Sequence, residues 1–245
     1  MPDWNPAEII GIKPKPLSLS LYQELITNNI WSKNRTRIGF QDVQPNQLMT
    51  NFYGTPYVDL RVDFNSWIPN KIPNYLKIKL INYYLNKFRK NKEYHDKVEF
   101  DILFTCFTPN TKNKLIKSLQ KNFSKKEIVL ISKELKQITL NLILNFNKEI
   151  QSINLLIKKQ NYIEKSNLYT IDKIFWLIND CKKYGTEPFA GLARCGFVAA
   201  EILNSFVTEK IITEKEKYKF LGSLKTITSS ILEDSKRLSK KTFIK

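Results

Sequence analysis

The residues best suited to chemistry lie in a short polar segment at positions 57–65. There, apolar side chains alternate with polar ones, among them Asp59 and Arg61. A period of two predicts a half-buried strand, with one face in the core and the other toward water. Residues 98–106 alternate in the same way and carry Glu99. The sequence therefore predicts a small antiparallel sheet whose polar face gathers acidic groups around Arg61.

Two interpretations of this polar face stay open. In the first, Asp59, Arg61 and Glu99 belong to a ladder of ion pairs between neighbouring strands, as ordinary sheets have. In the second, they line a pocket in which Arg61 binds a carboxylate or phosphate with two hydrogen bonds, while the acidic groups position a cation or hydroxyls. Asn65 and Ser66, at the expected strand end, would add neutral donors to that pocket.

Arg194 is a second candidate for contact with an anion. Small residues surround it in the segment 190–196, and small residues allow another backbone to come close. An arginine can equally bury its stem along the protein surface and keep its guanidinium in water. The sequence leaves both interpretations of Arg194 open.

The remaining catalytic inventory is small. With seven glycines in all, the chain has neither a Walker-type loop nor a GxGxxG motif after a strand, which excludes nucleotide sites of these kinds. His95 is the only histidine, and its polar surroundings favour a surface or capping role over catalysis. Cys106, Cys181 and Cys195 are widely spaced in apolar stretches, which favours buried reduced thiols over a disulfide or zinc framework.

The net charge of +17 and the isoelectric point near 9.6 make nucleic acid the first partner to consider. However, only six of the 40 basic residues are arginine, the residue that phosphate and guanine recognition favours. The lysines are scattered as on a solvated surface, which argues against nucleic acid and leaves an acidic partner open. No uninterrupted apolar run approaches the roughly 18 to 20 residues of a membrane span, and the chain does not begin like a signal peptide. We therefore expect a cytoplasmic protein without a membrane segment.

The periodicity elsewhere is helical. Helices are expected near 17–27 and 73–90, then over roughly 30 residues from Ser124. A helix near 171–183 should end at Gly185, another should begin at Pro188, and a capping box at Thr213 should open the last one. The predicted class is α+β and predominantly helical, with a small antiparallel sheet in the first half and a helical bundle in the second. The predicted division is 1–123 and 124–245, or one single domain.

Several motifs resemble the central region of phosphoenolpyruvate synthase-like proteins, which also include the pyruvate phosphate dikinases. They occur in a consistent order over nearly the whole chain. The segments are Asp3-Trp4-Asn5-Pro6-Ala7-Glu8, Tyr57-Val58-Asp59-Leu60-Arg61, Phe64-Asn65-Ser66, His95-Asp96-Lys97-Val98-Glu99-Phe100 and Pro188-Phe189-Ala190-Gly191-Leu192-Ala193-Arg194.

The resemblance implies a phosphotransferase whose ATP-grasp-like and phosphohistidine domains lie outside this chain, in cis or in trans. ATP and Mg²⁺ would bind to the complete enzyme and not to this chain, and the chain alone would be inactive. His95 does not lie in the family's phosphocarrier motif. The resemblance implies that this region binds the acceptor, such as pyruvate, or docks the swivelling domain. The expected substrate contacts are Asn5, Arg61, Asn65 and Arg194, supported by Asp59 and Glu99. A stand-alone helical interaction module and a basic nucleic-acid-binding protein remain the alternatives.

Overall fold

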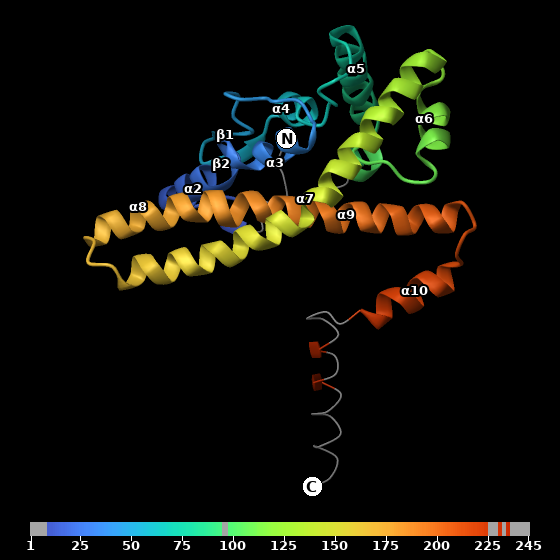
Figure 1. Ribbon diagram of the computed structural model, residues 1–245. Coiled ribbons are helices and arrows are strands. Elements are labelled where there is room, and N and C mark those ends of the chain that lie inside the picture. The colour runs from blue at the N-terminus through green and yellow to red at the C-terminus, as the bar shows by residue number, and fades with distance from the viewer. Residues whose placement is uncertain (1–8, 95–97, 225–229, 232–233, 236–245) are drawn as a thin grey trace.

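The chain folds into helices joined to one small β-hairpin, which confirms the predicted fold class (Figure 1). The computed structural model describes residues 9–94, 98–224, 230–231 and 234–235. Strand β1 (Met49–Phe52) pairs antiparallel with β2 (Thr55–Val58), and Met49 lies opposite Val58. Tyr53 and Gly54 connect them with φ values of 52° and 80°. Positive φ at both turn residues is typical of the two-residue hairpin turn that matches strand twist.

The strand predicted at 57–65 ends at Val58, and the strand predicted at 98–106 does not form, so both predictions were wrong for most of their length. Residues after Asp59 form a short helix, α4 (Leu60–Asn65), because the Asp59 carboxylate accepts the Arg61 backbone N–H at 2.9 Å and so caps the helix start. Residues Val98–Ile102 form a π-helical turn, η3, instead of a strand. The expected shared sheet face between Arg61 and Glu99 therefore does not exist.

The other described elements of the first half are helices and helical turns. They are α2 (Pro16–Tyr22), the π-helical η1 (Gln23–Thr27), α3 (Ile30–Ile38), α5 (Asn74–Lys90), the 3₁₀ turn η2 (Lys92–Tyr94) and α6 (Thr111–Leu119). The helices expected near 17–27 and 73–90 are thereby confirmed.

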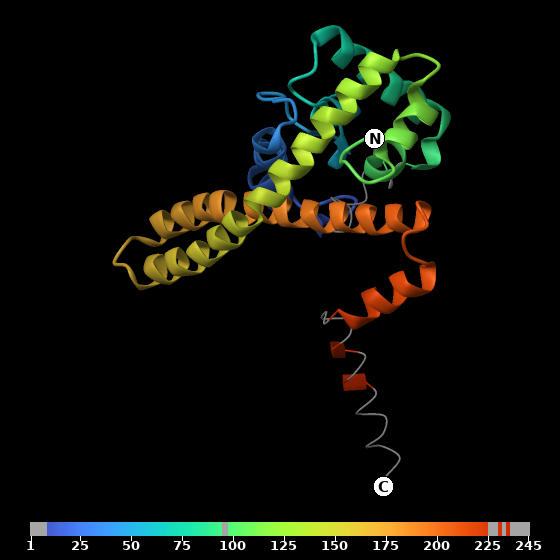
Figure 2. The ribbon, with the colours of Figure 1, turned by 45° about the vertical axis from the view of Figure 1, so that its right-hand side comes forward.

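Helix α7 (Lys125–Lys165) is the longest helix of the second half, and it is longer than predicted. A capping box between Ser124 and Glu127 opens it. Its first half is buried as expected, for example at Leu135, but the second half leaves Ile157 55% exposed. In both ribbon views that second half runs beside α8 (Thr170–Asp180), and the two project together as an arm (Figures 1 and 2).

Helices α8 and α9 (Glu187–Thr208) form one continuous rod through the π-helical segment η4 (Cys181–Thr186). Gly185 lies inside this rod, so the predicted helix end there was wrong. Residues Thr170–Thr208 are long and apolar enough to cross a membrane, by length and composition only, with a mean hydropathy of 1.3 in the most apolar window. A single helix of this kind is weak evidence for a membrane span, and this one carries the charged Arg194 and Glu201. The capping box at Thr213 is confirmed at the start of α10 (Glu214–Ser223).

One hydrophobic core joins the two halves of the chain. Leu80 and Tyr84 of α5 and Leu115 of α6 pack in the same cluster as Leu135 of α7 and Val198 of α9. The three cysteines are free thiols and half-buried, and burial raises the pKa of Cys106 to about 12. The Cys106 thiol is therefore a protonated packing group rather than a ready nucleophile.

Candidate functional site

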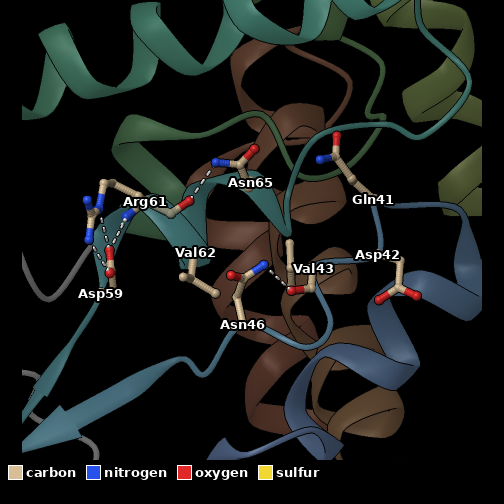
Figure 3. A pocket seen from close by; sticks show the side chains of 8 residues that line it. All are labelled: Gln41, Asp42, Val43, Asn46, Asp59, Arg61, Val62 and Asn65. Carbon is tan, nitrogen blue, oxygen red and sulfur yellow. Dashed lines mark hydrogen bonds and ion pairs between the residues drawn. The ribbon is translucent and has the colours of Figure 1, made fainter.

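A hollow of about 470 Å³ lies where the loop after α3 meets the start of α4 (Figure 3). Three of the residues singled out from the sequence, Asp59, Arg61 and Asn65, line it. Gln41, Asp42, Val43, Asn46 and Val62 complete the lining. Most of these side chains are polar, so the hollow suits a polar ligand in contact with water.

Asp59 holds Arg61 with two side-chain hydrogen bonds. Arg61 Nε donates to Asp59 Oδ1 at 3.1 Å, and Nη2 donates to Oδ2 at 2.7 Å. The hydrogen bonds from Arg61 lower the pKa of Asp59 below its usual value, and the carboxylate in turn raises the pKa of Arg61. Both groups are therefore charged at neutral pH, and Nη1 and the second hydrogen of Nη2 remain available to an anion.

The third predicted residue, Asn65, lies one helical turn after Arg61. Its Nδ2 donates to the Arg61 backbone oxygen at 2.7 Å. This bond fixes the orientation of the Asn65 amide. Arg61 and Asn65 both belong to the short helix α4 (Figure 3). Asp59, Arg61 and Asn65 thus lie together on the start of a helix, where the sequence predicted a sheet face.

Sequence reasoning missed the loop that forms the opposite wall. Gln41, Asp42 and Asn46 lie between α3 and β1, in a segment dense in turn-forming residues around Pro45. Asp42 Oδ1 accepts the Gln44 backbone N–H at 3.0 Å, and Asn46 Nδ2 donates to the Val43 oxygen at 2.8 Å. Short polar side chains that bond to their own loop are a recognisable turn signal. That signal predicts the loop's shape but not which helix it faces.

Arg194 and Glu99 do not line this hollow. Arg194 is 6% exposed, so the interpretation as a surface arginine was wrong. Its guanidinium forms an ion pair with Glu99, and Nη2 donates to the Thr105 backbone oxygen at 2.9 Å. Burial, followed by the nearby charge of Arg35, lowers the pKa of Arg194 to about 9. With that pKa the Arg194 side chain is charged at neutral pH. Because Glu99 is in η3 and Arg194 is in α9, their ion pair connects these two elements.

A tryptophan connects this buried pair to a second one. The guanidinium carbon of Arg194 lies 4.8 Å from the Trp67 ring centroid, and that of Arg35 lies 3.7 Å from it. Arg35 also forms an ion pair with Asp63 of α4, at 3.0 Å between Nη1 and Oδ1. Asp63 therefore anchors α4 to α3 and holds the wall that carries Arg61.

Other residues singled out from the sequence fall elsewhere. Asn5 and His95 lie outside the described residues. Within the described part of the chain, no group of three or more His, Cys, Asp or Glu side chains is arranged to hold a metal ion. The hollow's own carboxylates, Asp42 and Asp59, already accept hydrogen bonds from the protein.

The hollow therefore combines an anchored guanidinium with amides and carboxylates in an open site. Comparison of the chain with protein-family models, with curated proteins and with solved structures gives no significant match.

Proposed function

We propose that this chain is the acceptor-binding or docking region of a phosphoenolpyruvate synthase-like, ATP-dependent phosphotransferase. The observation that carries the proposal is the anchored guanidinium of Arg61 in an open polar hollow. Because Asp59 fixes the guanidinium with two bonds, its remaining N–H groups are oriented before a ligand arrives, which reduces the entropy lost on binding. A small carboxylate such as pyruvate is the kind of anion that these groups bind.

The proposal assigns ATP and Mg²⁺ to partner domains, in the same polypeptide or a separate one. In the complete enzyme a phosphoryl group would pass from ATP to a histidine of the swivelling domain and then to the acceptor held here. Asp59, Arg61 and Asn65 would bind and orient that acceptor. A cytoplasmic location is part of the same proposal.

Direct binding of pyruvate to the purified chain tests the role of Arg61. Chemical shift changes in NMR spectra would give the affinity for the native chain and for Arg61→Ala and Arg61→Lys. We expect Arg61→Ala to weaken binding by about tenfold, the size of one charged hydrogen-bonding interaction. Arg61→Lys should be intermediate, because lysine keeps the charge but not the planar pair of donors. Arg89→Ala, which removes an exposed arginine of α5, is the control, and equal affinity in all four proteins would contradict the proposal.

A stand-alone interaction module is the second candidate, favoured by apolar side chains exposed on the arm. Ile171 is 71% exposed, and Phe175 and Trp176 form an exposed edge-to-face pair on the same helix. Such a module would dock a separately encoded nucleotide-binding subunit. Sedimentation of this chain with such a subunit would show a complex that Trp176→Ser weakens. Tyr75→Ser changes an aromatic residue of α5 that is 60% exposed, against 50% for Trp176, and should leave that complex unchanged. If no complex forms, this candidate is excluded.

A further inference from the structure

The amides of the hollow have a defined orientation. Asn46 Nδ2 donates to the Val43 backbone oxygen at 2.8 Å, and Asn65 Nδ2 donates to the Arg61 backbone oxygen at 2.7 Å. A backbone carbonyl only accepts, so the atom that faces it must be the amide nitrogen. The Oδ1 atom of each side chain is therefore the end that remains for a ligand, together with one N–H of the same amide.

Gln41 adds a third amide to the lining of the hollow. Its Oε1 is buried and has no hydrogen-bond partner among the described residues, and its side chain lines the hollow. This oxygen is closed off from a ligand in the hollow, so the Gln41 group that can pair with a ligand hydroxyl is the amide nitrogen, which lies on the side of Asn65 in Figure 3. In the view of Figure 3, Gln41 and Asn65 lie at the upper end of the hollow, while Asn46 and Asp42 lie at the lower end.

These groups favour hydroxyls over apolar ligand surface. Each asparagine amide offers an oxygen that accepts beside an N–H that donates, and Gln41 offers N–H groups. A hydroxyl both donates and accepts, so it can pair with any of these groups. Of the described residues that line the hollow, only Val43 and Val62 have apolar side chains. A ligand with an extended apolar surface would therefore leave the amide oxygens unpaired.

The charges limit the ligand further. The hollow contains two carboxylates, Asp42 and Asp59, and one guanidinium, Arg61. A ligand with several negative charges would be repelled by the carboxylates, whereas a single negative charge can contact the free N–H groups of Arg61. The complement of the hollow is a molecule with one anionic end and several hydroxyls.

We propose that this hollow selects a polyhydroxylated monocarboxylate of the sugar-acid class. The inference deepens the proposed function and rests on it, because it names the chemistry of the acceptor that the Arg61 site would hold. Arg61 binds the carboxylate, and Gln41, Asn46 and Asn65 bind hydroxyls along the chain of the ligand.

Calorimetric titration of the purified full chain tests the selection with three probes. Gluconate carries one carboxylate and five hydroxyls, hexanoate has the same carbon count without hydroxyls, and pyruvate represents the small acceptor. We expect gluconate to bind at least about tenfold more tightly than hexanoate or pyruvate, since one satisfied amide oxygen corresponds to a change of that order. The comparison of gluconate with hexanoate needs no variant, so a folding defect cannot obscure it.

Gln41→Met then tests whether Gln41 binds the hydroxyls of the ligand. Methionine has nearly the same length but no amide, so we expect gluconate binding to weaken by about tenfold and pyruvate binding to stay the same. Gln151→Met, on an exposed position of α7, is the control and should change neither. Circular dichroism confirms that both variants are folded.

The possible failures are distinguishable. Equal binding of gluconate, hexanoate and pyruvate, all weakened by Arg61→Ala, would overturn the selection for hydroxyls and leave the proposed anion site intact. Pyruvate binding that Arg61→Ala weakens, with no gluconate binding, would have the same meaning. No saturable binding of any carboxylate would overturn both the selection and the proposed function.

Discussion

The guanidinium of Arg35 stacks on the ring of Trp67, 3.7 Å from the ring centroid. Trp67 is 3% exposed, and its ring also packs edge-on against Phe40 and lies 4.8 Å from the guanidinium of Arg194. Cation–π contacts of this kind gain strength when both partners are removed from water. The indole ring of Trp67, just after the helix that carries Arg61, thus connects this segment to α3 and α9.

Trp67→Ala should therefore be severely destabilising. The variant loses a large buried ring and two cation–π contacts at once, so we expect the free energy of unfolding to fall by about 3–5 kcal/mol. Urea denaturation followed by far-ultraviolet circular dichroism measures it. Trp176→Ala is the matched control, because the ring of Trp176 is 50% exposed and its loss should cost much less. A cost for Trp67→Ala below about 1 kcal/mol would show that the ring does not hold these segments together.

The pair of Arg194 and Glu99 gives a second stability prediction. Glu99→Gln leaves the buried Arg194 guanidinium without its counter-charge, so we expect a loss of about 2–3 kcal/mol in the free energy of unfolding. The value is below that of a fully buried pair because the Glu99 side chain is still 24% exposed. The double variant Glu99→Leu/Arg194→Met should be more stable than Glu99→Gln alone, since no unpaired charge remains. A double variant less stable than the single one would contradict this and would show that Arg194 stabilises the fold even without Glu99, through Thr105 and Trp67.

Local signals predicted the helices well. Ser124 and Thr213 cap helices through side chains that their own segments supply, so the sequence contains the whole interaction. The periodicity of α7 likewise predicted its buried face around Leu135. It did not predict that Ile157 of the same helix lies exposed, because periodicity identifies an apolar face but not whether a partner covers it.

The candidate site was predicted only in part. The residue types at Asp59, Arg61 and Asn65 indicated a polar site, but a helix cap made by Asp59 replaced the strand that alternation predicted. The other wall of the hollow and the partner of Arg194 depend on contacts between segments that are distant in the sequence. Nothing in the sequence near Gln41 shows that its loop faces α4, and nothing near Arg194 shows that it pairs with Glu99.

Two glycines of α9 should respond oppositely to alanine. A Cβ on Gly191 would lie 2.5 Å from Asn34 Nδ2 and 2.8 Å from Glu149 Oε1, whereas a Cβ on Gly196 would meet nothing within 4 Å. We expect Gly191→Ala to lower the free energy of unfolding by about 1–3 kcal/mol through overpacking. Gly196→Ala should raise it by about 0.5–1 kcal/mol, because alanine costs less conformational entropy in a helix interior. Thermal and urea unfolding of both variants measure the difference, and equal effects would contradict the close packing at Gly191.

The carboxyl group that Gly191 approaches should make stability depend on pH. Burial raises the pKa of Glu149, and the charge of Glu187 adds to the rise, while Arg37 and the amide of Asn34 oppose it. A raised pKa means that the folded protein binds this proton more tightly than the unfolded chain does. The stabilisation is complete below the unfolded pKa of a glutamate and is lost as the pH rises through the folded value.

Glu149→Gln removes this titration and keeps a group that can accept the Asn34 hydrogen bond. We expect the difference in unfolding free energy, variant minus native, to become more positive as the pH rises from about 4 to about 7. Urea denaturation of both proteins at several pH values in this range measures that difference. Glu209→Gln, at an exposed position after α9, corrects for general charge effects. A difference that falls with pH would mean that Arg37, and not burial, dominates the pKa of Glu149.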